Sequence, residues 1–307
     1  MTADTFTLDV PDGTGVVVHR WLPESAPKAV VLLAHGMAEH AARYDHFAKT
    51  LNRAGYAVYA PDHRGHGETA KTGLMGHFAD ANGWATVVDD LASLVGRIRQ
   101  DQPGVKVFYV GHSMGSMLGR SLAISHSDLI DGLVLSGTAG DPGLLGKVGA
   151  LIAALAVKVK GNRTPSPLMD KLTFGQYNAA FKPPRTNFDW LSRDPAEVDK
   201  YVADPWCGNV HTAGFFVDIL GGLAQINNAA EVAKIRPDLP IYLYAGTQDP
   251  VGGKNAAGVR AVAQQLRAAA VREVEEKYYP QGRHEMHNET NRADVESDVV
   301  AWLDAHI

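Results

Sequence analysis

The chain has 307 residues, of which 45% are apolar and 21% are charged, and its formal net charge is −5. This is the composition of an ordinary globular protein, and the length fits one large α/β domain, alone or with an inserted subdomain. Because the net charge is negative and no basic block occurs, a nucleic-acid partner is not expected.

A single cysteine, Cys207, excludes an intramolecular disulfide and a metal cage built from several cysteines. No apolar run reaches the ~18 residues that a membrane span needs. Residues 1–11 contain neither the basic nor the apolar region of a secretory signal. We therefore expect a cytoplasmic protein.

Apolar runs alternate with helical stripes in the first half of the chain. Residues 5–10 and 15–22 form two predicted strands separated by a Pro-Asp-Gly-Thr turn, which indicates an antiparallel hairpin at a sheet edge. Continuous apolar strands are expected at 28–34, 56–60, 107–110 and 130–135, and helices at 41–54, 84–98 and 114–126. The alternation predicts an α/β fold with a mainly parallel, doubly wound sheet.

This alternation stops after Ser136, and no strand is evident between residues 141 and 236. The pattern resumes with a strand at 241–245, a helix at 259–269, a strand at 273–279 and a closing helix at 295–303. An insertion between two sheet strands is expected to lie over their carboxyl ends, where ligands of open α/β sheets bind. We therefore expect a core of residues 1–140 and 237–307 and a mainly helical cap of residues 141–236.

The pentad Gly-His-Ser-Met-Gly at 111–115 stands between a predicted strand and a predicted helix. In that context G-x-S-x-G predicts a nucleophile elbow, a sharp turn that lifts the serine above the sheet. A Cβ atom at Gly111 or Gly115 would clash where the strand and the helix approach each other. The helix that follows directs free N–H groups and its positive dipole end at the serine. Ser113 is the predicted nucleophile.

A serine nucleophile needs a base, and the base needs an acid that orients it. In α/β-hydrolases the order along the chain is serine, acid, histidine. His284 follows the last predicted strand and is the predicted base, with His287 as the alternative. Asp249 follows the strand at 241–245 and is the predicted acid. Asp141, after the preceding strand, is the alternative acid, because some hydrolases carry it there.

The oxyanion that develops during acyl transfer needs two preorganised backbone donors. One is expected from the N–H of Met114, directly after the nucleophile. The other is expected from Met37, on the loop after the strand at 28–34.

Asp62, His63 and His66 are ligand types that could suggest a metal. The glycines and Arg64 among them favour instead a turn held by an Asp–Arg contact, with Arg64 supporting the site rather than binding substrate. We expect no metal and no cofactor.

Five motifs carry a resemblance to a known family: H-G-M-A-E-H at 35–40, P-D-H-R-G-H-G at 61–67, G-H-S-M-G-S at 111–116, G-T-Q-D-P at 246–250 and G-R-H-E at 282–285. Together they resemble the α/β-hydrolase superfamily, in its monoacylglycerol lipase/lysophospholipase branch, sometimes grouped with serine aminopeptidases. The resemblance spans nearly the whole chain. It implies Ser113, Asp249 and His284 as the catalytic triad and Met37 and Met114 as oxyanion donors.

The function expected from these features is a serine hydrolase that cleaves carboxylic esters through an acyl-enzyme. Monoacylglycerols, lysophospholipids or similar medium-chain esters are the expected substrates. A peptidase or a C–C bond hydrolase on the same triad is the alternative, followed by a non-catalytic ligand-binding scaffold.

Within the expected cap, residues 144–159 are strongly apolar, and Lys147, Lys158 and Lys160 lie in or beside them. This stretch is expected to form an acyl channel, a lid that touches a lipid monolayer, or a buried cap helix. The second possibility would give a peripheral membrane contact through the cap.

Overall fold

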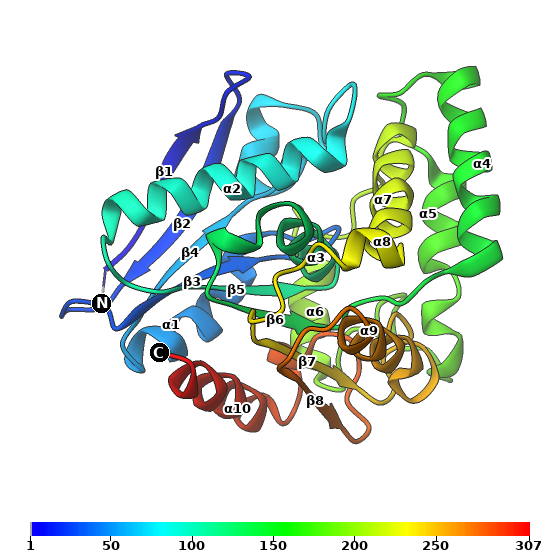
Figure 1. Cartoon of the computed structure of the whole chain (residues 1–307). Coiled ribbons are helices and arrows are strands. Elements are labelled where there is room, and N and C mark those ends of the chain that lie inside the picture. Colours follow the sequence, from blue (N-terminus) through cyan, green and yellow to red (C-terminus); the bar gives the residue numbers. More distant parts are fainter. Residues whose placement is uncertain (1) are drawn as a thin grey trace.

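A mixed eight-stranded sheet forms the centre of the computed structural model, which describes residues 2–307 (Figure 1). The strands are β1 (Thr2–Asp9), β2 (Gly15–Leu22), β3 (Ala29–Ala34), β4 (Tyr56–Pro61), β5 (Val107–His112), β6 (Gly132–Ser136), β7 (Ile241–Gly246) and β8 (Val274–Tyr279). Their order in the sheet is β1-β2-β4-β3-β5-β6-β7-β8. Strand β2 is antiparallel to both its neighbours, and all other neighbouring pairs are parallel. The predicted hairpin and mainly parallel sheet are confirmed.

Helices cover both faces of the sheet (Figure 1). One face packs against α2 (Gly83–Asp101), α3 (Met114–His126) and α9 (Ala257–Ala268), and the other against α1 (Asp45–Arg53) and α10 (Arg292–Ala305). Successive side chains of β3 alternate between the two apolar clusters, with Val30 and Leu32 in one and Val31 and Leu33 in the other. Strands such as β3 are buried on both faces, which is why they are continuously apolar in sequence.

Strand β3 lies between β4 and β5, so the chain leaves β3 in one direction and later returns on its other side. At such a reversal of strand order the loops after the two central strands diverge and leave a crevice at the carboxyl edge. The loops after β3 and β5 carry Met37 and Ser113, and the fold therefore places both residues at this crevice.

Residues 137–240, all of which the structure describes, contain helices and no strand beyond an isolated bridge between Pro165 and Thr212. The helices are α4 (Gly143–Lys160), α5 (Pro167–Phe174), α6 (Pro195–Ala203), α7 (Ala213–Ile226) and α8 (Ala229–Val232). Figure 1 shows α4, α5 and α7 beyond the ends of the strands rather than on a face of the sheet. The expectation of a strand-free helical segment here is confirmed. None of the helices in residues 2–307 is long and apolar enough to cross a membrane.

The predicted elements are found with ends shifted by at most three residues. Two details differ. The helix expected at 41–54 begins as a 3-10 helix over Ala41–Tyr44 before α1. The closing helix expected at 295–303 begins three residues earlier, at Arg292, and a short 3-10 helix over Met286–Asn288, which contains His287, precedes it.

Candidate active site

Ser113 stands at the tight turn between β5 and α3, with a φ of +51° that is unusual for a residue other than glycine. A Cβ at Gly115 would lie 2.1 Å from the carbonyl oxygen of Ala34, and one at Gly111 would lie 2.4 Å from that of Gly115. Neither position has room for a side chain, as the sequence indicated. Ser116 donates its hydroxyl to the carbonyl oxygen of Ser113 at 2.5 Å, so a serine serves here to hold the first turn of α3.

His284 and Asp249 meet at the carboxyl edge of the sheet. Nδ1 of His284 lies 2.9 Å from Oδ1 of Asp249, and the two residues are 3% and 1% exposed. The same Asp249 oxygen accepts the backbone N–H of Val251 at 2.8 Å. Asp141 is exposed, and its Oδ1 accepts the N–H of Gly143 where α4 begins. The structure therefore brings Asp249, rather than Asp141, to His284.

The imidazole of His284 packs between two rings, with centroid distances of 4.6 Å to His112 and 5.1 Å to Trp190. Burial disfavours the charged ring, but the Asp249 carboxylate outweighs it and holds the pKa of His284 above its usual value. His287 instead stacks on Phe47 at 3.9 Å, within the layer covered by α1 and α10, and burial lowers its pKa to about 3. His287 is thus a packing residue and not a partner of Ser113.

A cavity of about 350 Å³ lies over Ser113. Its lining includes His284 and the two expected oxyanion residues, Met37 and Met114. Much of its apolar wall comes from the segment between β6 and β7, through Phe174, Tyr177, Trp190, Ile219, Leu220 and Leu223. The arrangement can hold an apolar group beside a serine hydroxyl and a histidine that a carboxylate orients.

Comparison with known proteins agrees with this geometry. The family model described as "Serine aminopeptidase, S33" matches residues 25–291. The monoacylglycerol lipase of Mycolicibacterium smegmatis is 31% identical over 96% of this chain and 95% of its own length. The chain belongs to the α/β-hydrolase superfamily, in its monoacylglycerol lipase-like branch.

Other relatives of this hydrolase support the same placement. A carboxyl esterase from Bacillus coagulans, solved in complex with glycerol, superposes with a TM-score of 0.91 at 31% identity over 99% of both chains. Human monoglyceride lipase is 28% identical over 78% of this chain and 71% of its own length. The family description names aminopeptidases, whereas these relatives are named as lipases and esterases.

A buried charge network supports the loop of the hydrolase that carries Met37. The guanidinium of Arg43 bonds Glu39 at 2.5 Å and Glu285 at 2.6 and 2.7 Å. Glu39 also accepts the N–H of Gly36 at 2.6 Å, which fixes the loop. Burial would raise the pKa of Glu285, but Arg43 outweighs it and holds that pKa below its usual value.

The sequence did not predict this network, because Arg43 was given no role and Glu285 was named only as the last residue of the motif at 282–285. The available signal was the four-residue spacing of Glu39 and Arg43, which places two opposite charges on neighbouring turns. Nothing in the sequence pointed to Glu285 as the second partner, because it lies 242 residues further along the chain.

The expected contact between Asp62 and Arg64 is wrong. Arg64 bonds Asp12 and Asp90 instead, and so ties the β1–β2 turn to α2. Asp62 accepts the N–H groups of Ala41 and Glu68 and contacts His19, because the loop turns its carboxylate inward.

In the part of the chain that the structure describes, Asp62, His63 and His66 do not form a cluster of metal-ligand atoms. Two other groups of such atoms do occur.

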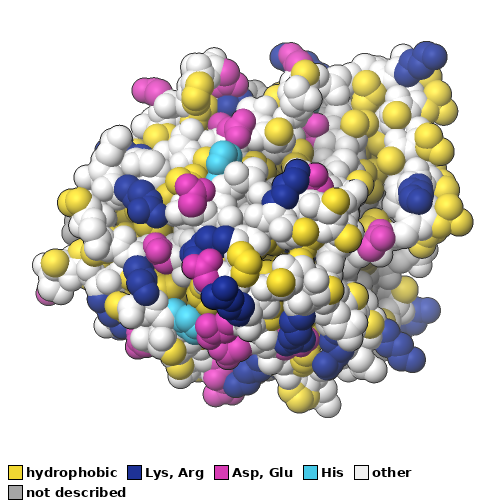
Figure 2. All heavy atoms as spheres, in the orientation of Figure 1, with side chains coloured by type: hydrophobic (Ala, Val, Ile, Leu, Met, Phe, Trp, Pro, Cys, Tyr) yellow, Lys and Arg dark blue, Asp and Glu magenta, His cyan; other side chains and the backbone are white. Residues whose placement is uncertain are grey.

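Helix α4 differs from what residues 144–159 led us to expect. Leu144, Leu145, Leu151, Leu155 and Val159 are between 60% and 84% exposed, and none of the described residues of α4 lines the cavity. The acyl-channel and buried-helix interpretations are therefore wrong for this stretch. The reason is that α4 packs on α7 through its small residues, such as Ala153 and Gly149, and turns its large apolar side chains outward. Figure 2 shows these side chains gathered along the α4 edge of the molecule.

Proposed function

We propose that this α/β-hydrolase cleaves carboxylic esters through an acyl-enzyme, with Ser113 as nucleophile, His284 as base and Asp249 as orienting acid. The observation that carries the proposal is the His284–Asp249 hydrogen bond at the wall of the cavity that also contains Ser113. Oγ of Ser113 attacks the ester carbonyl carbon while His284 takes its proton. His284 then gives that proton to the departing alcohol and activates water for deacylation.

Met37 and Met114 are the proposed oxyanion donors through their backbone N–H groups. Both residues line the cavity next to Ser113, and Met114 is the first residue of α3, where the helix dipole favours negative charge. The bond from Gly36 to buried Glu39 would keep the Met37 loop in place as the oxyanion forms.

The proposed substrates are monoacylglycerols, lysophospholipids or similar medium-chain esters. The apolar walls of the cavity fit an acyl chain, and relatives with this activity in their names cover nearly the whole chain. We further propose that residues 141–236 act as a cap on a core of residues 1–140 and 237–307, because side chains of this segment form much of the cavity wall.

An amine substrate fits this cavity less well than an ester. An aminopeptidase needs a free carboxylate for the substrate ammonium group, and the acidic residues that line the cavity are Glu39, Glu285 and Asp141. Glu39 and Glu285 are already bound to Arg43, and exposed Asp141 accepts the N–H of Gly143 where α4 begins. Neither buried carboxylate beside Ser113 is therefore left to bind an ammonium group, which favours an alcohol-bearing substrate over an amine-bearing one.

We also propose a peripheral contact of the cap with lipid surfaces. The outer face of α4 combines exposed leucines with Lys147, Lys158 and Lys160, which suits insertion of apolar side chains below anionic headgroups.

We also propose a cytoplasmic location, with which the free thiol of Cys207 agrees. Cell fractionation with an antibody to the natural protein would test the location.

The test of function is a substrate panel of p-nitrophenyl esters from butanoyl to decanoyl, monoacylglycerols, lysophospholipids and aminoacyl amides. We expect kcat/KM to rise several-fold with each pair of added methylenes until the cavity is full, because each buried methylene contributes about 0.8 kcal/mol. The Ser113→Ala variant should lose roughly four to six orders of magnitude in turnover while its unfolding midpoint stays unchanged. Preference for aminoacyl amides, or activity retained in folded Ser113→Ala, would contradict the proposal.

A further inference from the structure

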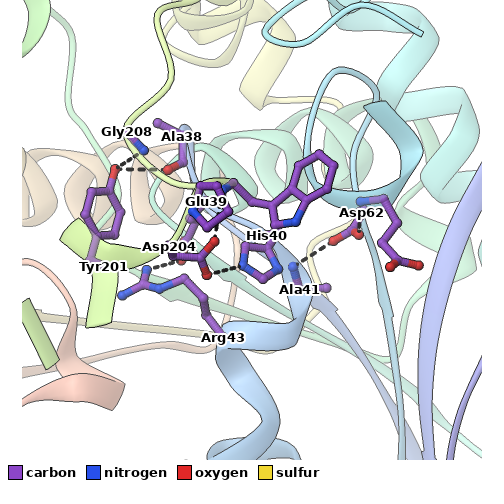
Figure 3. A network of polar contacts seen from close by, with 12 residues as sticks. Ala38, Glu39, His40, Ala41, Arg43, Asp62, Tyr201, Asp204 and Gly208 are labelled. Atoms are coloured by element: carbon purple, nitrogen blue, oxygen red, sulfur yellow. Dashed lines mark hydrogen bonds and ion pairs between the residues drawn. The ribbon is translucent and has the colours of Figure 1, made fainter. Parts of the chain in front are cut away.

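The end of α6 and the segment that follows it are held against the loop after β3 (Figure 3). Tyr201 of α6 also lines the catalytic cavity. The hydroxyl of Tyr201 and the N–H of Gly208 both donate to the carbonyl oxygen of Ala38, at 2.9 and 3.0 Å. Ala38 has a φ of +59°, so this carbonyl is presented by a strained turn that the two donors hold. The contact fixes the relative positions of two segments that lie 163 residues apart.

Three side chains that are common metal ligands meet beside this contact. Nε2 of His40 lies 2.8 Å from Oδ2 of Asp204. Figure 3 shows these two side chains next to each other. Together with Cys207 they offer one nitrogen, one oxygen and one sulfur, all within 4.8 Å of one another. All three residues are partly exposed, so an ion could enter and keep a water ligand.

The surrounding charges favour a divalent cation. The lysine and arginine side chains that line the same pocket as His40 and Asp204 are Arg43, Lys200 and Arg292. Arg43 is bound to Glu39 and Glu285, and the other two are bound to Glu197. The carboxylate of Asp204 bonds none of these three cations, so its negative charge remains for a metal ion to neutralise.

We propose that His40, Asp204 and Cys207 form a three-ligand Zn²⁺ site that ties the loop after β3 to the segment after α6. Nitrogen, oxygen and sulfur ligands with one water form a tetrahedral shell that Zn²⁺ accepts. The ligand atoms of such a shell lie roughly 3.3–3.8 Å apart, so the His40–Asp204 pair opens slightly. On binding, the thiol of Cys207 releases its proton to solvent and the resulting thiolate bonds the ion.

One other group of described residues brings ligand atoms equally close, namely Glu273, Glu275 and His306. It offers no sulfur, and its two carboxylates are exposed, so it suits a harder and more weakly held ion. The two groups of residues can therefore be distinguished experimentally, because they prefer different ions and only the group with Cys207 gives a thiolate-to-metal absorption band.

Cobalt(II) substitution tests the proposal in the full-length, untagged protein. Thiolate bound to Co²⁺ gives a sulfur-to-metal charge-transfer band, and because Cys207 is the only cysteine, such a band identifies its ligand. We expect one equivalent of Co²⁺ to produce this band and Zn²⁺ to abolish it by competition. Equilibrium dialysis with metal analysis should give one tightly bound Zn²⁺ per chain, with a rise in the thermal unfolding midpoint.

Cys207→Ser should remove the band and weaken Zn²⁺ binding roughly tenfold or more, and Asp204→Asn should also weaken it. His46→Ala, at a histidine whose side chain is 59% exposed, and His306→Ala are the matched controls and should leave the band intact. The absence of a charge-transfer band in wild type would overturn the proposal even if Cys207→Ser fails to fold. Zn²⁺ binding that is lost in His306→Ala and kept in Cys207→Ser would assign the ion to the other group.

Discussion

Two strongly apolar stretches of the chain, β3 and α4, have opposite surroundings. Every residue of β3 is buried, because α2, α3 and α9 cover one face of the sheet and α1 and α10 cover the other. In α4 the one fully buried residue among those described is Ala153, and Leu144, Leu145 and Leu151 are more than 70% exposed. High apolar content therefore means burial in the core strand β3, but not in helix α4.

The two stretches differ in how many elements pack against them. A central strand has a neighbouring strand on each side and a helical layer on each face, so every apolar side chain along it is buried. Helix α4 lies at the edge of the molecule and packs mainly on α7, which covers only its face of small residues. An exposed apolar face of this size is typical of a surface that meets another apolar phase.

The largest expected effect is a loss of kcat, and it compares an aspartate at the end of a core strand with one at the start of the inserted segment. Asp249 follows β7 and bonds His284, whereas Asp141 is exposed and caps the turn before α4. Asp249→Asn should reduce kcat on the order of 10⁴-fold, because the amide favours the wrong tautomer of His284. Asp141→Asn should change kcat by less than about twofold. Steady-state kinetics on one ester decides, and a reversed order of the two losses would assign the acid to Asp141.

The second effect concerns stability and uses the same side chain in both places. Leu33 in β3 is 1% exposed and Leu151 in α4 is 72% exposed. Leu33→Ala should lower the free energy of unfolding by about 2–5 kcal/mol through lost burial and a cavity, whereas Leu151→Ala should change it by less than about 0.5 kcal/mol. Denaturant titrations followed by circular dichroism measure both. A large loss for Leu151→Ala would mean that α4 is covered in solution.

The third effect is a pH dependence of stability, and it arises from histidines where the core meets the segment between β6 and β7. His66, on the loop after β4, and His211, before α7, bring their Nε2 atoms to 3.0 Å, and His35 and His63 lie in the same buried group. Burial lowers the pKa of His63 to about 3 and that of His66 to about 4, and it lowers those of His35 and His211 as well. The folded state thus keeps neutral rings at pH values where the unfolded chain binds protons.

The contribution of these four histidines to the free energy of unfolding should therefore be constant above about pH 6.5 and fall below it, towards the lower pKa values of the folded state. Each such histidine contributes a loss of about 1.4 kcal/mol per pH unit in that window. Urea titrations at several pH values measure the slope. His211→Gln should reduce the slope, and the exposed-site variant His46→Ala should not. Stability that does not change between neutral and mildly acid pH would show that these rings are already protonated in the fold.

The sequence was sufficient where one local rule determines the structure. Close packing around Gly111 and Gly115 explains the elbow, and the order of strands along the chain placed Asp249 and His284 at one edge. It was insufficient where the partner is remote. Arg43 and Glu285, or Arg64 and its carboxylates, meet only after folding, and no spacing in the chain encodes those pairs. The sequence also left three interpretations of the leucines of α4 open, because an apolar stretch does not show what covers it.

The smallest expected effect tests what covers α4. Leu151 and Leu155 are 72% and 60% exposed, and neither lines the cavity, so acidic residues there should not disturb catalysis. Leu151→Glu/Leu155→Glu should weaken binding to anionic phospholipid vesicles roughly tenfold, since two apolar contacts are lost and two negative charges are added. Its kcat/KM on a short soluble ester should equal that of the wild type. Co-sedimentation with vesicles and a p-nitrophenyl acetate assay measure the two quantities.

Leu74→Glu/Val202→Glu is the matched control, because these side chains are 38% and 52% exposed but lie outside α4. It adds the same charge to the molecule and should leave vesicle binding nearly unchanged if the contact is confined to α4. Equal loss in both double variants would mean that net charge alone governs binding. If the α4 variant still binds vesicles, the exposed leucines of α4 do not contact lipid. They would then be the contact surface for a protein partner or for a second copy of the chain. A fall in soluble-ester turnover would show instead that α4 affects the shape of the cavity although none of its residues lines it. In that case α4, like β3, would contribute to the structure of the active site despite its exposed leucines.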